Sequence, residues 1–152
     1  MSIDDTDRRI LRHLLAEPDL PTAVLAERAG VTSGTCWRRL ERLRGLGVLR
    51  GQGMAVDWRR LGYEIEVSLR FTLDKTAPRA FDDFLEAARK VPEVIQIQTF
   101  LGRVDVRLNM VARNMAHYQE VYRSRILTLP HIADIEALMH VATIKDSVEL
   151  PL

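Results

Sequence analysis

Apolar residues near the start of the chain recur every three or four positions, the spacing of one face of an amphipathic helix. Asp4 is placed to cap a first helix that ends at Glu17-Pro18. Pro21-Thr22 opens a second helix, and Gly30 ends it. The side chains expected to face inward are Ile10, Leu11, Leu14 and Leu15 in the first helix, and Val24, Leu25 and Ala29 in the second.

A third helix, predicted from Ser33 to Gly45, has one apolar stripe and one arginine-rich face. Thr32 is placed as its N-cap. The apolar stripe consists of Cys36, Leu40 and Leu43, and Leu46 and Val48 are expected to continue the burial. Two helices joined through a glycine turn, the second of them basic, are typical of a helix-turn-helix. Arginines on one helix face are also common as solvated charge, so the helix alone leaves both interpretations open.

The residues after the third helix predict a short wing. A small hairpin around Gly51 and Gly53 would contain Val48, Leu49, Met54 and Val56, and it would place Arg50 near a phosphate backbone. The residues expected to contact DNA are Thr32, Ser33, Gly34, Thr35, Arg38, Arg39, Arg42 and Arg50.

Different roles are expected within this set. Ser33 and Thr35 suit base edges or nearby phosphates, whereas the arginines of the helix mainly suit the DNA backbone. Arg39 has an alternative, which is to pair with an acidic group of the first helix. Trp37 is expected to pack against the wing or the first helix.

From Tyr63 onward the apolar period changes from helical to alternating. Residues 65–73 alternate apolar and polar side chains, as in a strand with one buried face. The following segments predict, in order, a helix from Pro78 with Phe81, Phe84, Leu85 and Ala88 inward, strands around 94–101 and 104–110, a helix around 118–126 and a strand over about 132–141. The order βαββαβ predicts a ferredoxin-like α+β domain.

Length and charge agree with two small domains. The chain has 152 residues, of which 47% are hydrophobic. We expect a DNA-binding domain with its linker over 1–60 and a second domain over 61–152. These carry formal charges of +3 and −2. The small positive surplus suggests that useful DNA affinity needs several copies of the chain.

The remaining composition predicts a cytoplasmic protein. No apolar run is long enough to span a bilayer, and the acidic start is unlike a signal peptide. The single cysteine, Cys36, is expected to be a buried, inert thiol.

A turn at Gly102-Arg103-Val104-Asp105 presents backbone amides beside one carboxylate. That pairing can hold the carboxylate and the ammonium of a zwitterion. The alternative is a plain hairpin turn with a solvated aspartate.

Short motifs with characteristic order and spacing run nearly from end to end. They are Ile3-Asp4, Asp7-Arg8-Arg9-Ile10-Leu11, Leu25-Ala26-Glu27, Gly30-Val31-Thr32, Cys36-Trp37-Arg38-Arg39-Leu40, Leu43, Gly47-Val48, Val56-Asp57, Leu61-Gly62-Tyr63, the 102–105 turn, Leu129-Pro130, Lys145 and Leu150-Pro151-Leu152. In these motifs the chain closely resembles the Lrp/AsnC family of feast/famine transcriptional regulators.

The resemblance implies a winged helix-turn-helix followed by a βαββαβ domain that dimerises sheet to sheet. It also implies assembly of dimers into an octamer and binding of an amino acid at the glycine-aspartate turn. Asp105 would meet the ligand's ammonium, and amides near Gly102 and Arg103 its carboxylate. The implied effector site comprises Leu101, Gly102, Arg103, Asp105, Ile135 and Ala137.

Three positions of this site depart from the family pattern. Family members often carry hydroxyl side chains where this chain has Val106, Ile135 and Ala137. A polar ligand side chain would lack partners there. We therefore predict an apolar or aromatic amino acid as effector, or no amino-acid effector at all.

Two other function classes compete with a ligand-responsive regulator. Some relatives are haem-pathway decarboxylases with a histidine-asparagine-tyrosine stretch on the second strand, but residues 94–100 contain no histidine. The four histidines lack metal-ligand spacing, and no catalytic constellation stands out, so we expect neither enzyme activity nor a metal or cofactor. The main alternative is an architectural DNA-organising protein that ignores small molecules.

Overall fold

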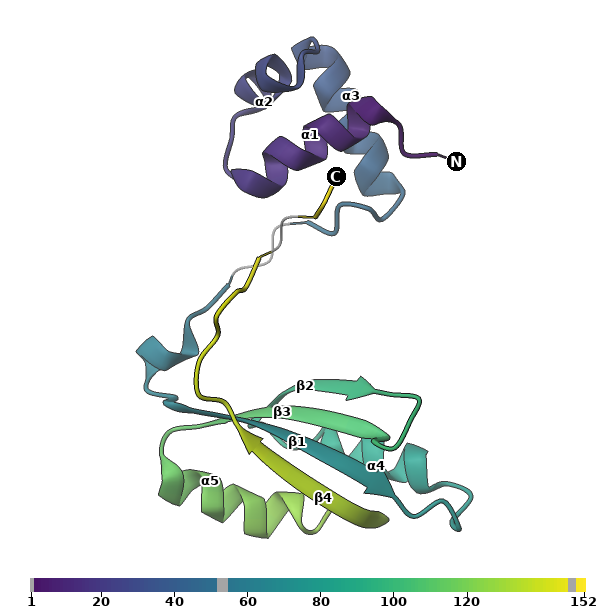
Figure 1. Cartoon of the computed structure of the whole chain (residues 1–152), viewed down its shortest axis with the longest axis vertical. Coiled ribbons are helices and arrows are strands. Elements are labelled where there is room, and N and C mark those ends of the chain that lie inside the picture. The colour runs from purple at the N-terminus through teal and green to yellow at the C-terminus, as the bar shows by residue number, and fades with distance from the viewer. Residues whose placement is uncertain (1, 52–54, 148–149) are drawn as a thin grey trace. The chain divides into compact units, whose positions relative to one another are not determined.

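The computed structural model describes residues 2–51, 55–147 and 150–152 (Figure 1). It divides into two compact units, one formed by Met1–Ala55 with Ile144–Leu152 and the other by Val56–Thr143. The last residues thus group with the N-terminal unit, whereas the sequence prediction counts them in the second domain. One contact that holds them there is a hydrogen bond in which Arg12 Nη2 donates to the carbonyl oxygen of Leu152 at 2.8 Å.

The N-terminal unit contains the three predicted helices. These are α1 (Asp5–Ala16), α2 (Thr22–Ala29) and α3 (Ser33–Gly45). The Asp4 carboxylate caps α1 by accepting from the Asp7 amide at 2.9 Å. Gly30 ends α2 with a φ of 67°, a left-handed conformation that favours glycine. The helices bury Ile10, Leu25, Ala26, Ala29, Cys36 and Leu40 in one core.

The region after α3 differs from the prediction. Leu46 and Val48 are exposed rather than buried, because Gly47, with a φ of 72°, turns the chain away after the last turn of α3. The described residues 46–51 and 55–57 form no strand, so they do not pair as a hairpin wing. Met54 lies outside the described residues.

The second unit has the predicted βαββαβ order after a short 3₁₀ helix, η1 (Trp58–Leu61). Its elements are β1 (Ile65–Leu73), α4 (Ala80–Ala88), β2 (Val94–Thr99), β3 (Val106–Ala112), α5 (Met115–Val121), the π-helical turn η2 (Tyr122–Ile126) and β4 (Ile132–Met139). The strands form one antiparallel sheet in the order β2-β3-β1-β4. The helices pack on one face of this sheet (Figure 1).

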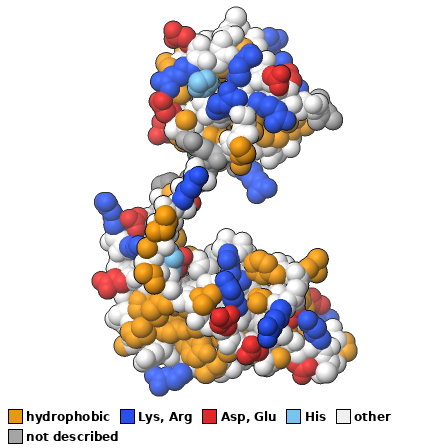
Figure 2. Space-filling view, viewed as in Figure 1, with side chains coloured by type: hydrophobic (Ala, Val, Ile, Leu, Met, Phe, Trp, Pro, Cys, Tyr) orange, Lys and Arg blue, Asp and Glu red, His pale blue; other side chains and the backbone are white. Residues whose placement is uncertain are grey.

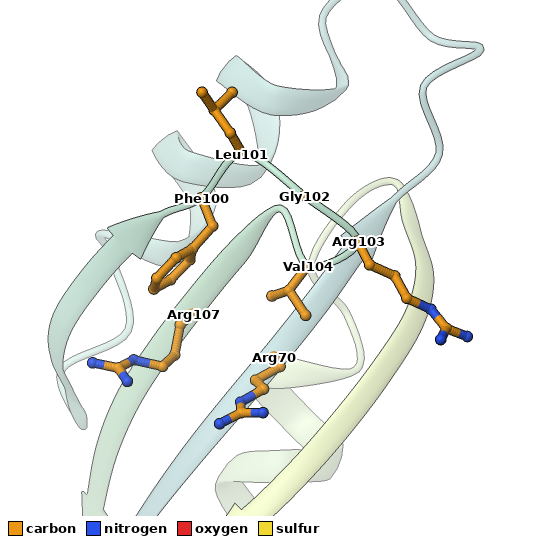
Figure 3. Close-up of a pocket in the computed structure, with 7 residues that line it drawn as sticks. All are labelled: Arg70, Phe100, Leu101, Gly102, Arg103, Val104 and Arg107. Carbon is orange, nitrogen blue, oxygen red and sulfur yellow. The ribbon is translucent and has the colours of Figure 1, made fainter.

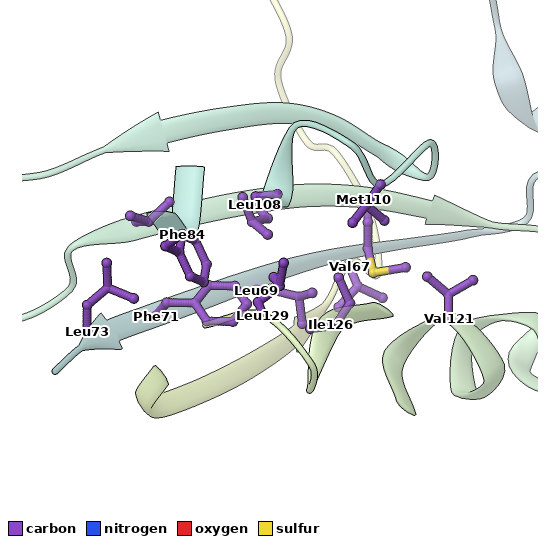
Figure 4. Close-up of a cluster of buried hydrophobic side chains, with 13 residues drawn as sticks. Val67, Leu69, Phe71, Leu73, Phe84, Leu108, Met110, Val121, Ile126 and Leu129 are labelled. Carbon is purple, nitrogen blue, oxygen red and sulfur yellow. The ribbon is translucent and has the colours of Figure 1, made fainter. Parts of the chain in front are cut away.

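The core of this unit lies between the sheet and the helices (Figure 4). Alternate residues of β1 point into it, as the period of two predicts. The rings of Phe71 and Phe84 pack with their centroids 4.8 Å apart. Each such fully buried side chain contributes roughly 1.5–3 kcal/mol.

Some predicted core positions and strand ends are wrong. Phe81 is 40% exposed, because Ala80, Phe84 and Ala88 form the inward stripe of α4 and Phe81 lies beside it. β2 and β3 end short of the turn between them, which leaves Leu101 fully exposed and Val104 outside a strand. β4 likewise ends at Met139, so Val141 is exposed beyond it.

Candidate functional site

The start of α3 presents small residues and one arginine to solvent. Ser33, Gly34 and Arg38 are exposed, and Thr32 caps the helix by accepting from the Thr35 amide at 3.2 Å. A Cβ added to Gly34 would have nothing within 4 Å, so this end of the helix is open to close approach. The helix dipole gives the same end a positive partial charge.

Two arginines of the predicted DNA-binding set are turned toward α1. Arg39 pairs with Asp4 and, at 3.3 Å, with Asp7. Arg42 pairs with the other oxygen of the Asp7 carboxylate, which is completely buried. Arg39 therefore pairs with acidic groups at the start of α1, the alternative to a DNA contact. The sequence prediction missed the same arrangement for Arg42, although two carboxylates at the start of α1 could have suggested it.

These contacts also perturb a carboxyl group. The Asp7 amide, which donates to Asp4, and the neighbouring Arg39 guanidinium lower the pKa of Asp4 from 3.8 to about 2. Asp4 is thus held in its charged form at the end of α1 that favours negative charge.

Fewer free cations remain on the third helix than its sequence suggests. Arg44 pairs with Glu41 within α3. Among the described residues, Arg38 donates to the Thr35 hydroxyl, at 3.4 Å, and Arg50 is exposed after the helix. Lys and Arg side chains nevertheless gather on the visible face of the N-terminal unit (Figure 2).

The expectation that Trp37 packs against the wing or α1 is wrong. Its side chain is 57% exposed. The reason lies in the helical period: Cys36, Leu40 and Leu43 form the buried stripe, and Trp37 lies about 100° away, one turn after Gly34. This large aromatic side chain is not among the DNA contacts predicted from the sequence. By contrast, Cys36 is buried, and burial raises the pKa of its thiol.

The glycine-aspartate turn is attached to the end of β1. Gly102 has a φ of 151°, which favours glycine. The Asp105 amide donates to the Phe71 carbonyl oxygen at 2.8 Å, and its Oδ2 accepts from the Leu73 amide at 2.9 Å. Its other carboxylate oxygen lies 3.1 Å from Lys75 Nζ.

Asp105 is therefore already engaged within the unit. It is only 6% exposed. The Leu73 hydrogen bond and the Lys75 ammonium lower the pKa of this carboxyl despite its burial. The plain alternative of a solvated aspartate is excluded by this burial.

A cavity of about 380 Å³ opens beside the turn (Figure 3). It is lined by Arg70, Phe100, Leu101, Gly102, Arg103, Val104 and Arg107. It thus brings together three predicted effector residues, Leu101, Gly102 and Arg103. Arg70, Phe100 and Arg107 are not among the predicted effector residues. Phe100 and Arg107 flank the turn in the sequence, whereas Arg70 is placed beside it by the register of β1 with β3.

The other predicted effector residues lie apart from this cavity. Ile135 lines an adjoining cavity of about 430 Å³ that also includes Arg70, Arg103 and Val104. Asp105 and Ala137 line neither of the two.

The structure offers no constellation for metal chemistry or membrane insertion within its described ranges. No three His, Cys, Asp or Glu side chains there lie close enough to hold a metal ion. No helix in those ranges is both long and apolar enough to cross a bilayer.

Comparisons with known proteins agree with both units. Residues 3–50 match a family model described as winged helix-turn-helix DNA-binding, and residues 66–150 match one described as Lrp/AsnC ligand binding domain. The chain is 27% identical over 150 residues to the glutamate uptake regulatory protein of Zymomonas mobilis, covering 99% of this chain and 91% of that one. It is 25% identical to the DNA-binding transcriptional activator DecR of Escherichia coli, covering 99% of each chain.

Solved structures give the same result. An AsnC family transcriptional regulator from Agrobacterium tumefaciens is 28% identical and superposes with a TM-score of 0.83, over 97% of this chain and 96% of that one. A regulator from Neisseria meningitidis, solved with L-Met, shares the fold with a TM-score of 0.87 at 24% identity, over 99% and 97% of the two chains. The relatives are transcriptional regulators rather than enzymes. The chain therefore belongs to the Lrp/AsnC family of DNA-binding transcriptional regulators.

Proposed function

We propose that this regulator binds specific DNA through the start of α3 and responds to a small apolar or aromatic amino acid bound beside Gly102. The observation that carries the proposal is the pairing of an open, positively polarised helix end in one unit with a cavity at the glycine turn in the other. Family membership gives the general class, and these two sites support the finer assignment that we propose.

On the DNA side, Ser33 and Thr35 are proposed to meet base edges or nearby phosphates, with Thr32 and Gly34 allowing close approach. Arg38 and Arg50, which have no acidic partner among the described residues, are proposed to bind phosphates. Arg39 and Arg42 then act mainly by fixing α3 against α1.

On the effector side, Phe100, Leu101 and Val104 provide apolar surface, and Gly102 and Arg103 provide the turn. The regulators from Neisseria meningitidis and Mycobacterium tuberculosis were solved with L-methionine, an apolar amino acid, which supports this class of ligand. A ligand ammonium at Asp105 would compete with the Lys75 ammonium, which lies 3.1 Å from this carboxylate.

The third part of the proposal concerns the assembly of several copies of the chain. A single N-terminal domain has little surplus charge, so linked copies would raise the effective DNA affinity. We propose a homodimer formed through the sheet face that the helices leave uncovered, with dimers assembling to an octamer. Such a regulator acts where the DNA is, in the cytoplasm.

Footprinting on DNA upstream of the chain's own coding sequence tests the DNA half of the proposal. We expect a protected site whose affinity clearly exceeds that of random DNA at physiological salt, and whose protection changes with an apolar or aromatic amino acid. Equal binding to random DNA with no effect of any amino acid would favour the architectural alternative.

Calorimetric titration with the twenty amino acids tests the effector half. We expect binding of methionine, leucine, tryptophan or their relatives. Tight binding of a polar amino acid alone would contradict the assignment.

A further inference from the structure

One large apolar side chain of α3 lies outside the buried stripe of this helix. Cys36, Leu40 and Leu43 are buried, and Trp37 is the remaining apolar residue between Ser33 and Gly45. Its side chain is exposed, although an indole is among the largest apolar groups that a core can bury. The packing of α3 against the other helices therefore does not account for Trp37.

The helical period places Trp37 on the outward face of α3. Trp37 follows Gly34 by three residues, so the two positions lie on the same side of the helix, and Arg38 is exposed beside them. The negative charge of Glu41, one turn further along this face, is offset by its ion pair with Arg44. The outward face thus combines a glycine, an exposed cation and a large apolar ring.

The space beside Gly34 is open to an approaching surface. A Cβ added to this glycine would have nothing within 4 Å, so the Trp37 side chain does not fill that space. A surface that enters it would meet the Gly34 backbone and the neighbouring indole together. In a helix-turn-helix, the N-terminal residues of the recognition helix face the base edges in the major groove.

The chemistry of an indole suits one group of the major groove better than the others. Phosphates favour cations and hydrogen-bond donors, whereas an indole is a broad apolar ring with a single N–H donor. The apolar group that base edges present in the major groove is the C5-methyl of thymine. Apolar wedges that unstack base pairs act from the minor groove, whereas a recognition helix lies in the major groove.

We infer that Trp37 is a specificity-determining residue that packs against the C5-methyl group of a thymine in the major groove. The operator then contains a thymine at one fixed position of each half-site, next to the bases that the start of α3 approaches. This inference rests on the proposed function, because it assigns one base contact within the proposed DNA site of α3.

Replacement of thymine by uracil tests the inference, because uracil keeps the hydrogen-bonding groups of thymine and lacks only the methyl. The probes are duplexes of the site protected in footprinting, each with a different thymine replaced, titrated with the full chain. We expect uracil at one thymine of each half-site to weaken binding at least about threefold. Unchanged affinity with uracil at every position would overturn the inference.

A Trp37→Ala chain connects the methyl group to this side chain. The variant should bind the intact site about tenfold more weakly and should lose the sensitivity to uracil, because the methyl then has no partner. Its melting temperature should stay close to that of the unmodified chain, because the side chain is exposed. If the variant kept the full sensitivity to uracil, the methyl would contact another residue and the inference would fail.

Leu46→Ala is the matched control, because it also shortens an exposed apolar side chain of the N-terminal unit. Leu46 follows the last turn of α3, far along the helix from Gly34. The control should bind the intact site like the unmodified chain and should keep the sensitivity to uracil. Equal effects of the two variants would show a general response to lost apolar surface and would contradict the role of Trp37.

The outcomes separate this inference from the proposed function. A protected site that tolerates uracil throughout leaves specific DNA recognition intact and removes the role of Trp37. If Trp37→Ala changed only the association of copies in sedimentation, with unaltered DNA affinity, the indole would face a second copy and the inference would again be removed. Absence of any protected site removes the proposed DNA recognition, and the inference with it.

Discussion

The guanidinium of Arg42 pairs with the carboxylate of Asp7, a side chain with no exposed surface. An arginine of the apparent DNA-binding face thus joins α3 to α1. Arg39 reaches the same carboxylate from one turn earlier. The third helix is therefore positioned by buried charge as well as by its apolar stripe.

Replacing Asp7 should destabilise the N-terminal unit strongly. Asp7→Ala leaves Arg39 and Arg42 without their shared partner, and we expect it to lower the free energy of unfolding by about 3 kcal/mol. Urea denaturation followed by circular dichroism measures this loss. Asp5→Ala, at an exposed position of the same helix turn, should change stability by less than about 1 kcal/mol. Similar curves for the two variants would contradict the structural role of Asp7.

Arg38 and Arg42 should respond differently to removal. Arg38→Ala is expected to weaken specific and random DNA alike and to reduce the slope of log affinity against log salt by about 0.9, the share of one phosphate contact. Arg42→Ala should instead lower stability, because its partner is buried. Binding isotherms over a salt series provide the test. A loss confined to the specific site in Arg38→Ala would assign Arg38 to base readout.

Gly34→Ala should shift folding and binding in opposite directions. An added Cβ meets nothing within 4 Å, and alanine favours helix, so we expect stability to rise by up to about 1 kcal/mol. DNA affinity should fall if the helix end approaches the duplex closely. Melting curves and mobility-shift titrations on the same preparation measure both quantities. Unchanged DNA affinity would show that this end of α3 does not approach the duplex closely.

Removing the Asp105 side chain should loosen the glycine turn. Asp105→Ala leaves the Leu73 amide without its side-chain acceptor, which we expect to cost about 1–3 kcal/mol. Lys75→Gln removes only an exposed partner and should cost less than about 1 kcal/mol. Denaturant titrations distinguish the two variants, and equal losses would assign the stabilisation to the ion pair instead.

The lowered pKa of Asp4 predicts an acid-sensitive N-terminal unit. A carboxyl whose pKa is lower in the folded chain stabilises the fold above its ordinary value and loses that contribution as the pH falls through the folded value. We therefore expect Asp4 to contribute above pH 3.8 and to lose this effect on approach to about 2. Asp4→Asn keeps a capping side chain without the titration, so its melting temperature should fall less steeply in this window. Parallel curves for the two chains would refute the assignment.

The features of the fold that the sequence predicts correctly are those that depend on neighbouring residues. Asp4, Gly30 and Thr32 act on their own helix ends, and the alternation along β1 depends only on neighbouring residues. The prediction that Phe81 faces inward is wrong because more than one stripe of α4 contains apolar residues. The packing against the sheet buries the stripe of Ala80, Phe84 and Ala88 and leaves Phe81 exposed.

The sites were harder to predict because their geometry is non-local. Arg42 and Asp7 are 35 positions apart, and their pairing depends on how two helices cross. The opposition of Arg70 and Arg107 depends on the register of β1 with β3. The turn at Gly102 could be recognised in the sequence, but the engagement of Asp105 by Leu73 and Lys75 could not.

The exposure of Trp37 has an optical consequence. The chain contains two tryptophans, and the other, Trp58, belongs to the second unit, where it is half-buried. An indole in water changes its emission when a macromolecule covers it, so Trp37 is an intrinsic fluorophore on the helix proposed to meet DNA. A Trp58→Phe chain would report occupancy of α3 without any added label.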